Sequence, residues 1–210
     1  MTPPPPPSFV VIVPVKPPAR GKSRLDAFPP DQRRDLAAAF ARDTVAAARR
    51  TPGVEAVLGV TDDFRFAADL RADGCAVIPD GVSEDLNATL RQAAAEAVRR
   101  WPHALPVALC ADLPSLRSDD LAAALREVSG PSFVRDAAGT GTTMYAAPLP
   151  LFDPAFGPGS AVAHAAGGAR EVVAPSPTLR VDVDEPHDLE VVLGLGVGTH
   201  TARAWELHTH

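Results

Sequence analysis

Short apolar runs alternate with longer amphipathic stretches through the first two thirds of the chain. Four runs rich in β-branched or other apolar residues predict strands, at residues 9–15, 54–60, 75–78 and 105–111. Stretches whose apolar residues recur at helical spacing separate these runs and predict helices over 30–50, 62–72, 85–101 and 118–128. Strand–helix alternation of this kind indicates an α/β fold with a mostly parallel central sheet.

The pattern changes after residue 130. Short runs between Gly- and Pro-rich loops predict strands at 132–134, 142–147 and 179–183, and a last helix is predicted over 186–195. Residues 196–210 show no clear periodicity and are expected to form a C-terminal tail. The Pro-rich start, residues 1–8, is expected to be a disordered arm. A single domain over residues 9–195 is therefore predicted.

Composition restricts the class of protein. The 210 residues are 46% hydrophobic, yet no apolar run reaches the roughly 18 residues of a membrane span, so neither a membrane protein nor a secreted one is expected. The formal net charge of −6 disfavours a general nucleic-acid binder, which usually carries a basic surplus. Cys75 and Cys110 show no metal-binding spacing and are expected to be buried thiols, as in a cytoplasmic protein.

The only two lysines of the chain, Lys16 and Lys22, lie in one loop directly after the first predicted strand. Arg20 and Arg24 share this loop, and arginine supplies the positive charge everywhere else. Open α/β sheets bind ligands at the carboxyl ends of their strands, so the loop is predicted to contact a triphosphate. Its GKS tripeptide does not complete a P-loop, because Lys16 stands where that motif needs glycine. A solvated turn stiffened by prolines is the simpler alternative.

Three aspartates are candidates for a magnesium site. Asp112 follows the fully apolar run 105–111, as at the tip of a strand buried on both faces of a parallel sheet. Asp182 and Asp184 are two residues apart in a strand-like run, which places both side chains on one face. Carboxylates so close repel one another unless a cation lies between them, and Mg²⁺ prefers oxygen ligands. The alternatives are a turn aspartate at 112 and a solvated acidic turn before the helix at 186.

Two glycine-containing segments could bind an anion through backbone N–H groups. They are residues 139–144 (GTGTTM) and 156–164 (FGPGSAVAH), and Ser160 is expected to begin a short helix running through His164. Asn87 lies at the start of the helix predicted over 85–101, where it either caps the helix or contacts a base edge. Ser118, ahead of two aspartates, is the expected N-cap of the following helix.

The order of these strings resembles one enzyme family. The series PVK…GKSRL, DLNATL, ADLPSL, GTGTTM, FGPGSAVAH and VDVDEPHDL is similar to the guanylyltransferases of coenzyme F-420 biosynthesis, within the MobA-like nucleotidyltransferase superfamily. The match runs from about residue 9 to 195. The resemblance implies a Rossmann-like three-layer sandwich, as in nucleotide-diphospho-sugar transferases. It also implies a Mg²⁺-dependent transfer of GMP from GTP to the phosphate of phosphoenolpyruvate or 2-phospho-L-lactate, with release of pyrophosphate.

The resemblance also assigns roles to the candidate residues. Lys16, Arg20, Lys22 and Arg24 would hold the triphosphate, with Lys22 and Arg24 acting in catalysis together with Asp112, and Asn87 would lie near the guanine or ribose. The metal ligands would be Asp112, Asp182 and Asp184. The three-carbon acceptor would be bound by residues of the two glycine-containing segments: Thr142 or Thr143, with Gly157, Gly159 and Ser160. His164 and His187 are expected to be structural, because the acceptor phosphate is already ionised near pH 7 and needs no general base.

Two alternatives remain at this point. One is another MobA-like nucleotidyltransferase with a molybdopterin or sugar-phosphate acceptor, although such enzymes usually begin with a glycine-rich loop where this chain has PVKPPARGKSRL. The other is a non-catalytic nucleotide-binding regulatory domain, which would need no metal carboxylates. The resemblance further suggests a handover of the product to the deazaflavin-ligating transferase. The sequence leaves the choice between the two acceptors open, because they differ only at C2 and C3.

Overall fold

A computed structural model of the chain describes residues 7–15, 25, 27–82, 85–173 and 176–209. The basic loop with Lys16, Arg20, Lys22 and Arg24 therefore lies outside the described residues, as does most of the Pro-rich arm. The prediction that this loop contacts a triphosphate stays a prediction.

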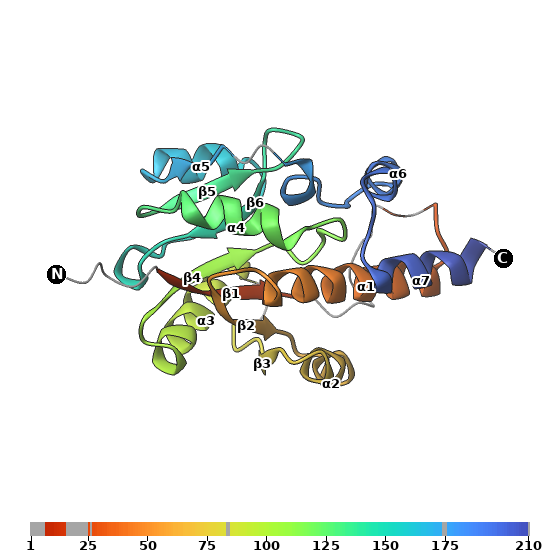
Figure 1. Ribbon diagram of the computed structural model, residues 1–210, viewed down its shortest axis with the longest axis horizontal. Helices are drawn as coiled ribbons and strands as arrows, with labels where there is room; N and C mark the ends of the chain where they lie inside the picture. The colour runs from red at the N-terminus through yellow and green to blue at the C-terminus, as the bar shows by residue number, and fades with distance from the viewer. Residues whose placement is uncertain (1–6, 16–24, 26, 83–84, 174–175, 210) are drawn as a thin grey trace.

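A central sheet of mostly parallel strands organises the described residues (Figure 1). Its strands are β1 (Ser8–Pro14), β2 (Val54–Val60), β3 (Ala76–Ile78), β4 (Ala104–Leu109), β5 (Ser132–Arg135), β6 (Thr142–Ala146) and β7 (Arg170–Glu171). They lie in the order β3-β2-β1-β4-β6-β5-β7, and β6 alone among them runs antiparallel to its neighbours. Because β6 is reversed, its first residues lie at the same edge as the carboxyl ends of β4 and β5.

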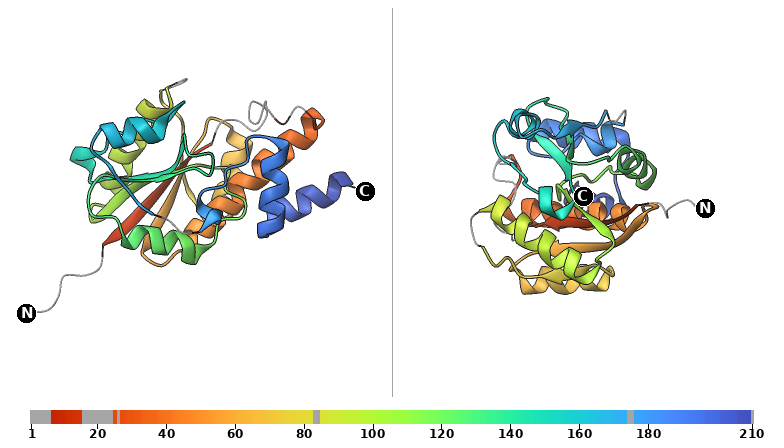
Figure 2. Two further views of the ribbon diagram at one scale, coloured as in Figure 1. Left: turned by 90° about the horizontal axis from the view of Figure 1, so that it is seen from above. Right: turned by 90° about the vertical axis from the view of Figure 1, so that its left-hand side faces the viewer.

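Helices cover both faces of this sheet (Figure 2). They are α1 (Pro30–Arg49), α2 (Phe64–Ala72), α3 (Leu86–Arg100), α4 (Ser118–Arg126), α5 (Ser160–Ala166), α6 (Pro186–Leu195) and α7 (Thr199–Thr209), with short 3-10 turns η2 (Leu149–Leu151) and η3 (Pro177–Leu179). Apolar side chains of α1, α2 and α4 pack on one face, and those of α3 and α5 on the other. The predicted three-layer α/β fold with its mostly parallel sheet is confirmed.

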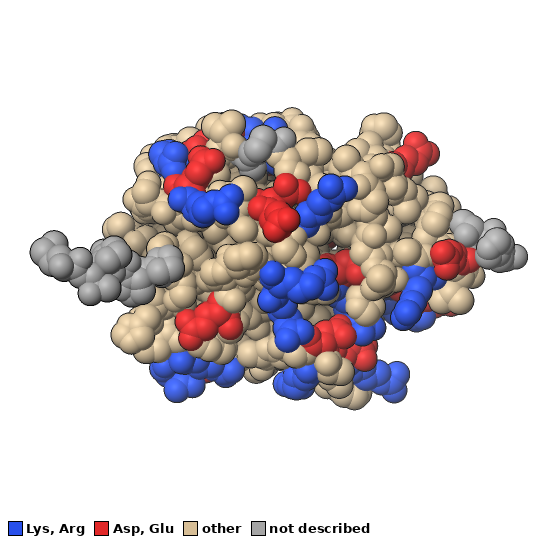
Figure 3. Space-filling model, in the orientation of Figure 1, with Lys and Arg blue, Asp and Glu red and all other residues tan. Residues whose placement is uncertain are grey.

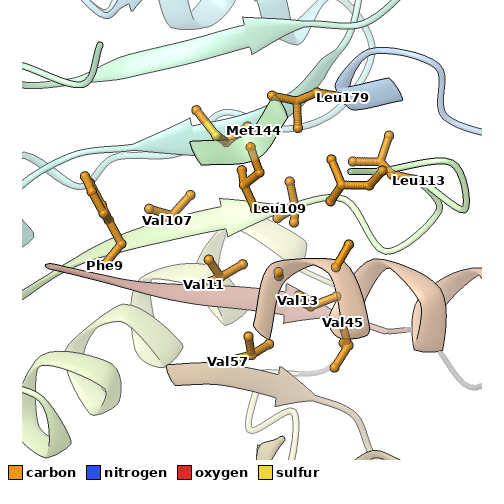
Figure 4. Close-up of a cluster of buried hydrophobic side chains, with 14 of the residues drawn as sticks. Phe9, Val11, Val13, Val45, Val57, Val107, Leu109, Leu113, Met144 and Leu179 are labelled. Atoms are coloured by element: carbon orange, nitrogen blue, oxygen red, sulfur yellow. The ribbon is translucent and has the colours of Figure 1, made fainter. Parts of the chain in front are cut away.

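Alternation along β1 explains why one strand serves both layers. Val11 and Val13 join the cluster under α1 and α4, whereas Val10 and Ile12 join the cluster under α3. All four side chains are at most 1% exposed, as expected of a central parallel strand with helices on both faces. Figure 4 shows Val11 and Val13 with Val45 of α1 in the first of these clusters.

The last two helices build a third, smaller cluster at one end of the molecule. Helix α7, which no clear periodicity of residues 196–210 predicts, packs against α1 (Figure 1). Asp43 of α1 accepts hydrogen bonds from the backbone N–H groups of His200 and Thr201 at 3.1 and 2.7 Å, and so caps the first turn of α7. A Cβ at position 198 would collide with the Asp43 carboxylate, which explains Gly198. The cluster also holds Leu25 and Phe28, which follow the basic loop.

Three local predictions were wrong or only partly right. Arg117 is the N-cap of α4, while Ser118 is its first residue and donates its hydroxyl to the Ala47 carbonyl at 3.1 Å. Residues 179–183 form no strand: η3 ends at Leu179 and an irregular segment follows outside the sheet. Cys75 is a buried thiol as expected, whereas Cys110 is only half-buried.

Two further features of the described residues concern their helices and their surface charges. Among these residues no helix combines the length and the apolar character that crossing a bilayer requires. On the face seen in Figure 3, acidic and basic side chains lie interspersed rather than gathered by sign.

Candidate active site

The predicted site residues that the structure describes gather at one edge of the sheet. Strand β4 leads into Asp112, and β5 leads into Asp136. The Cys110 N–H donates to the Thr143 carbonyl at 2.8 Å, which ties the start of β6 to the end of β4. Val15, the last described residue before the basic loop, bonds through its N–H to the end of β2 at the same edge. Parallel strands open a ligand crevice at this edge.

The three candidate metal ligands come together. One carboxylate oxygen each from Asp112, Asp182 and Asp184 lies within 4.8 Å of the other two. Burial, followed by the negative charges of Asp112 and Asp184, raises the pKa of Asp182 to about 7. A divalent cation would relieve this repulsion, and three carboxylate oxygens are the donors that such a hard cation prefers. The three residues therefore fit a divalent metal site, and the binding of Mg²⁺ by them stays a prediction.

Hydrogen bonds fix residues 180–184, the segment that carries Asp182 and Asp184 and is here termed the metal segment. The Val183 N–H donates to the carbonyl oxygen of Asp112 at 3.1 Å, which docks the segment on the tip of β4. On its N-terminal side, the hydroxyls of Ser176 and Thr178 donate to the carboxylate of Asp120 on α4 at 2.7 and 2.6 Å. The two aspartates thus share a side of the site without belonging to a strand.

Asp136 and Arg180 shape the neighbouring turn, and no sequence motif predicts the role of either residue. The Asp136 carboxylate accepts from the N–H groups of Thr140 and Gly141 at 3.0 and 2.7 Å and closes the turn between β5 and β6. A Cβ on Gly141 would collide with this carboxylate. The Arg180 guanidinium donates to the carbonyls of Arg135 and Asp136 at 3.0 and 2.9 Å, which joins the turn to the metal segment.

Strand β6 begins with two adjacent threonines, and the second of them lies in a β-bulge. Arg135 pairs with Thr142 and Val134 with Met144, so Thr143 is the extra residue. The Thr143 hydroxyl donates to the Leu179 carbonyl at 2.7 Å, on the side of the metal segment. The Thr142 hydroxyl instead contacts Nδ1 of His164 at 3.0 Å, next to the second glycine segment. The two side chains point to different sides, as expected of neighbours in a strand.

His164 is a neutral, structural side chain. Its ring lies among those of Phe133, Tyr145 and Phe156, with centroids 4.6 to 5.7 Å apart, and burial lowers its pKa to about 4. Nε2 accepts the backbone N–H of Ala155 at 2.9 Å, so the ring proton resides on Nδ1. The Nδ1–H therefore donates to the Thr142 hydroxyl oxygen. The proton of that hydroxyl consequently points away from the imidazole.

The second glycine segment leads into α5 beside this pair. Gly157 and Gly159 have φ values of 141° and 71°, which side chains with a Cβ rarely adopt. Ser160 begins α5, as predicted, and is 2% exposed. The Ala161 N–H donates to the Thr140 carbonyl at 3.2 Å, so the two predicted anion-binding segments lie side by side.

Asn87 lies in the first turn of α3 and faces the same segment. Its amide donates to the Phe156 carbonyl at 2.9 Å and accepts the Phe156 N–H at 2.8 Å. The helix is capped by Asp85 instead, whose carboxylate accepts the Ala88 N–H. The position of Asn87 near the guanine or ribose stays a prediction.

Comparison with known proteins identifies the family. The sequence profile described as guanylyl transferase, CofC-like, matches residues 9–205. The chain belongs to this family. A phosphoenolpyruvate guanylyltransferase of Thermomonospora curvata is 48% identical over 93% of this chain and 87% of the relative, and one of Streptomyces scabiei is 45% identical over 93% and 95%. The family resemblance that the sequence motifs indicate is thus confirmed.

A solved structure supports the fold independently. The crystal structure of a protein assigned as a nucleotide-diphospho-sugar transferase from Desulfovibrio desulfuricans superimposes with a TM-score of 0.69 at 16% identity, covering 94% of each chain. At that identity the likeness extends to the fold alone.

Proposed function

We propose that this protein transfers GMP from GTP to the phosphate of phosphoenolpyruvate and releases pyrophosphate. The observation that carries the proposal is the convergence of Asp112, Asp182 and Asp184 at the sheet edge where the threonine and glycine segments meet. Two relatives named phosphoenolpyruvate guanylyltransferase support the acceptor. A regulatory nucleotide-binding domain would gain nothing from three mutually repelling carboxylates.

The reaction requires two anions to approach one another. An oxygen of the acceptor phosphate forms a bond to the α-phosphorus of GTP, and the bond from that phosphorus to the bridging oxygen of pyrophosphate breaks. No proton has to be removed from the attacking phosphate, because it is ionised near pH 7. The protein therefore has to orient both anions and balance their charge.

Two groups of residues would orient the anions and balance their charge: the three aspartates and the basic loop. Asp112, Asp182 and Asp184 would hold Mg²⁺, which when bound neutralises phosphate charge and orients the reacting oxygens. The basic loop would bind the triphosphate through Lys16, Arg20, Lys22 and Arg24, and Lys22 and Arg24 would also act in catalysis. The assignment of these four side chains rests on the family motif and on the position of the loop after β1.

The acceptor would bind beside Thr142 and the glycine segment that leads into α5. Thr142 can donate its hydroxyl proton to a phosphate or carboxylate oxygen, because its own oxygen already accepts from His164. Gly157, Gly159 and Ser160 would add backbone and hydroxyl donors. Thr143 donates to Leu179 instead, which favours Thr142 as the acceptor contact.

The proposal also includes the product and the step that follows. The product would be the guanosine diphosphate-linked enolpyruvyl intermediate of coenzyme F-420 biosynthesis, formed in the cytoplasm and passed to the deazaflavin-ligating transferase. With 2-phospho-L-lactate as the acceptor, the linked group would be lactyl.

The decisive experiment measures pyrophosphate release by the purified protein with Mg²⁺ and GTP. Phosphoenolpyruvate and 2-phospho-L-lactate are supplied separately, and the deazaflavin-ligating transferase is present to consume an unstable product. We expect release with phosphoenolpyruvate, and no release when ATP, CTP or UTP replaces GTP. Release only with 2-phospho-L-lactate would correct the acceptor, and release with neither from a folded, GTP-binding protein would refute the proposal.

A further inference from the structure

Asn87 holds the backbone of a residue far away in the sequence. Its Nδ2 donates to the Phe156 carbonyl at 2.9 Å, and its Oδ1 accepts the Phe156 N–H at 2.8 Å. The side-chain amide thus pairs with both polar groups of one residue, and the pairing fixes which end of the amide is oxygen. Because Asn87 belongs to the first turn of α3, this contact joins α3 to the segment before α5.

The preceding peptide is held by a second side chain. The Ala155 N–H donates to Nε2 of His164 at 2.9 Å, and the Phe156 ring lies edge-on to the imidazole with centroids 5.4 Å apart. Two consecutive backbone N–H groups are therefore bound by side chains from two different helices. Contacts of this kind fix the end of a loop more firmly than solvent-exposed backbone bonds do.

The residues that follow need such an anchor. Residues 157–160 contain two glycines with positive φ, and a Cβ built at Gly157 or Gly159 meets no atom within 4 Å. Packing therefore does not force the conformation of these glycines, and glycine itself is the most permissive residue. Their position relative to Thr142 depends on where the chain is held at Phe156 and where α5 begins.

We propose that Asn87 is a positioning residue for the acceptor segment 157–160, acting through the backbone of Phe156. The inference rests on the proposed role of this segment in binding the phosphoenolpyruvate acceptor. It assigns Asn87, at the start of α3, to the acceptor side of the reaction, in contrast to a direct contact with guanine or ribose. Loss of the amide would leave the active-site groups present but the segment poorly placed.

The test compares Asn87→Ala with a variant that lowers stability elsewhere. Asp73→Ala removes the carboxylate, at the end of α2, that accepts two hydrogen bonds from Arg42. Steady-state rates with GTP and phosphoenolpyruvate varied in turn give the two KM values, and thermal melts give Tm. We expect Asn87→Ala to raise the acceptor KM by about tenfold or more, since two hydrogen bonds are lost, with less than about a twofold change in the GTP KM.

Asp73→Ala should lower Tm without changing either KM. A rise confined to the GTP KM in Asn87→Ala would overturn the proposal in favour of a nucleotide contact. Unchanged KM values with a lowered Tm would reduce Asn87 to a purely structural role and also overturn it.

Hydrogen exchange separates this inference from the proposed reaction. Without any substrate, the amides of Ala155 and Phe156 should exchange much faster in Asn87→Ala than in Asp73→Ala. If the protein released no pyrophosphate with phosphoenolpyruvate but showed this difference, the reaction proposal would fail while the anchoring role stood. Equal exchange in the two variants would refute the anchoring role whatever the reaction proves to be.

Discussion

The backbone N–H of Val183 donates to the carbonyl oxygen of Asp112 at 3.1 Å. This bond docks the segment after η3 on the tip of β4. Val183 lies between Asp182 and Asp184 in the sequence, so the bond also places both of these aspartates. Backbone geometry therefore brings three carboxylates together before any cation is bound. The three carboxylates repel one another at this edge and so lower the stability of the fold, as expected where residues serve a charged ligand.

Removing one carboxylate should stabilise the metal-free protein and abolish its response to metal. We expect Asp182→Asn to raise Tm in the presence of a chelator, because the buried charge beside Asp112 and Asp184 is lost. Addition of Mg²⁺ with GTP should raise Tm in the wild type and not in the variant, since bound ligand stabilises the folded state. Turnover should fall by at least about a hundredfold if the metal orients the reacting oxygens.

Glu190→Gln is the matched control for this prediction. It removes a carboxylate from α6, where Glu190 is exposed and lies outside the carboxylate group. Its melting and turnover should follow those of the wild type. An Asp182→Asn variant that kept the metal-dependent rise in Tm would exclude Asp182 from the metal site.

The same residue predicts a pH dependence with a definite sign. The folded-state pKa of Asp182 is raised to about 7, above its ordinary value, so between about pH 4 and 7 the folded state binds a proton that the unfolded state has lost. Its contribution to the stability of the metal-free protein is therefore present at low pH and is lost as pH rises through 7. In denaturant melts, the free energy of unfolding of Asp182→Asn should increase relative to that of the wild type from pH 5 to 8. A difference independent of pH would contradict the raised pKa.

Periodicity predicted most of the architecture because local sequence determines it. The β-branched run of β1 and the helical spacing of Leu36 and Phe40 in α1 are properties of short segments, and both elements form as predicted. The convergence of Asp112 with Asp182 and Asp184 was also predictable, from a strand tip and a motif of closely spaced acids.

Other features depend on contacts that no short segment contains. The sequence 179–183 looks like a strand, yet the pairing position beside β5 belongs to Arg170–Glu171 of β7. Helix α7 has weak periodicity of its own, and a carboxylate from α1 caps its first turn. Asp136 and Arg180 bind backbone groups brought together by the fold, so neither residue belongs to a recognisable motif. In such cases tertiary contacts override local preference.

The different hydrogen-bond partners of Thr142 and Thr143 predict different effects for these two adjacent residues. Replacement by valine keeps the shape of the side chain and removes the hydroxyl. Thr142→Val should raise the KM for phosphoenolpyruvate by about tenfold, since a donor to the acceptor is lost, and should leave the KM for GTP nearly unchanged. Measurement of both KM values provides the test.

Thr143→Val should affect mainly stability. The valine leaves the Leu179 carbonyl without its hydroxyl donor in a buried position, which costs about 1–3 kcal/mol. For a chain of this size, that cost corresponds to a fall in Tm of about 2–4 °C for each kcal/mol. The reverse outcome, with Thr143→Val raising the acceptor KM and Thr142→Val leaving it unchanged, would assign the acceptor contact to Thr143.

The last prediction concerns the connection between α7 and the basic loop. The buried carboxylate of Asp43 caps α7, and α7 packs with Trp205 against Phe28, whose ring lies 6.1 Å away edge-on. Asp43→Ala should therefore cost about 2 kcal/mol of stability, as expected for lost hydrogen bonds to a charged group. Because Leu25 and Phe28 follow the basic loop directly and lie in the same cluster, the KM for GTP should also rise several-fold.

Asp35→Ala is the matched control on the same helix. Asp35 contacts His208 near the other end of α7 at 3.3 Å, but at the surface, where such a pair is worth less than about 1 kcal/mol. Melting temperature and the GTP KM should change little in this variant. If Asp43→Ala lowered Tm while the KM for GTP stayed constant, α7 would stabilise the fold without supporting the nucleotide loop. A lowered Tm together with a raised KM for GTP would show that the C-terminal helix supports the nucleotide loop, since a helix remote from the substrates would then determine how tightly GTP is held.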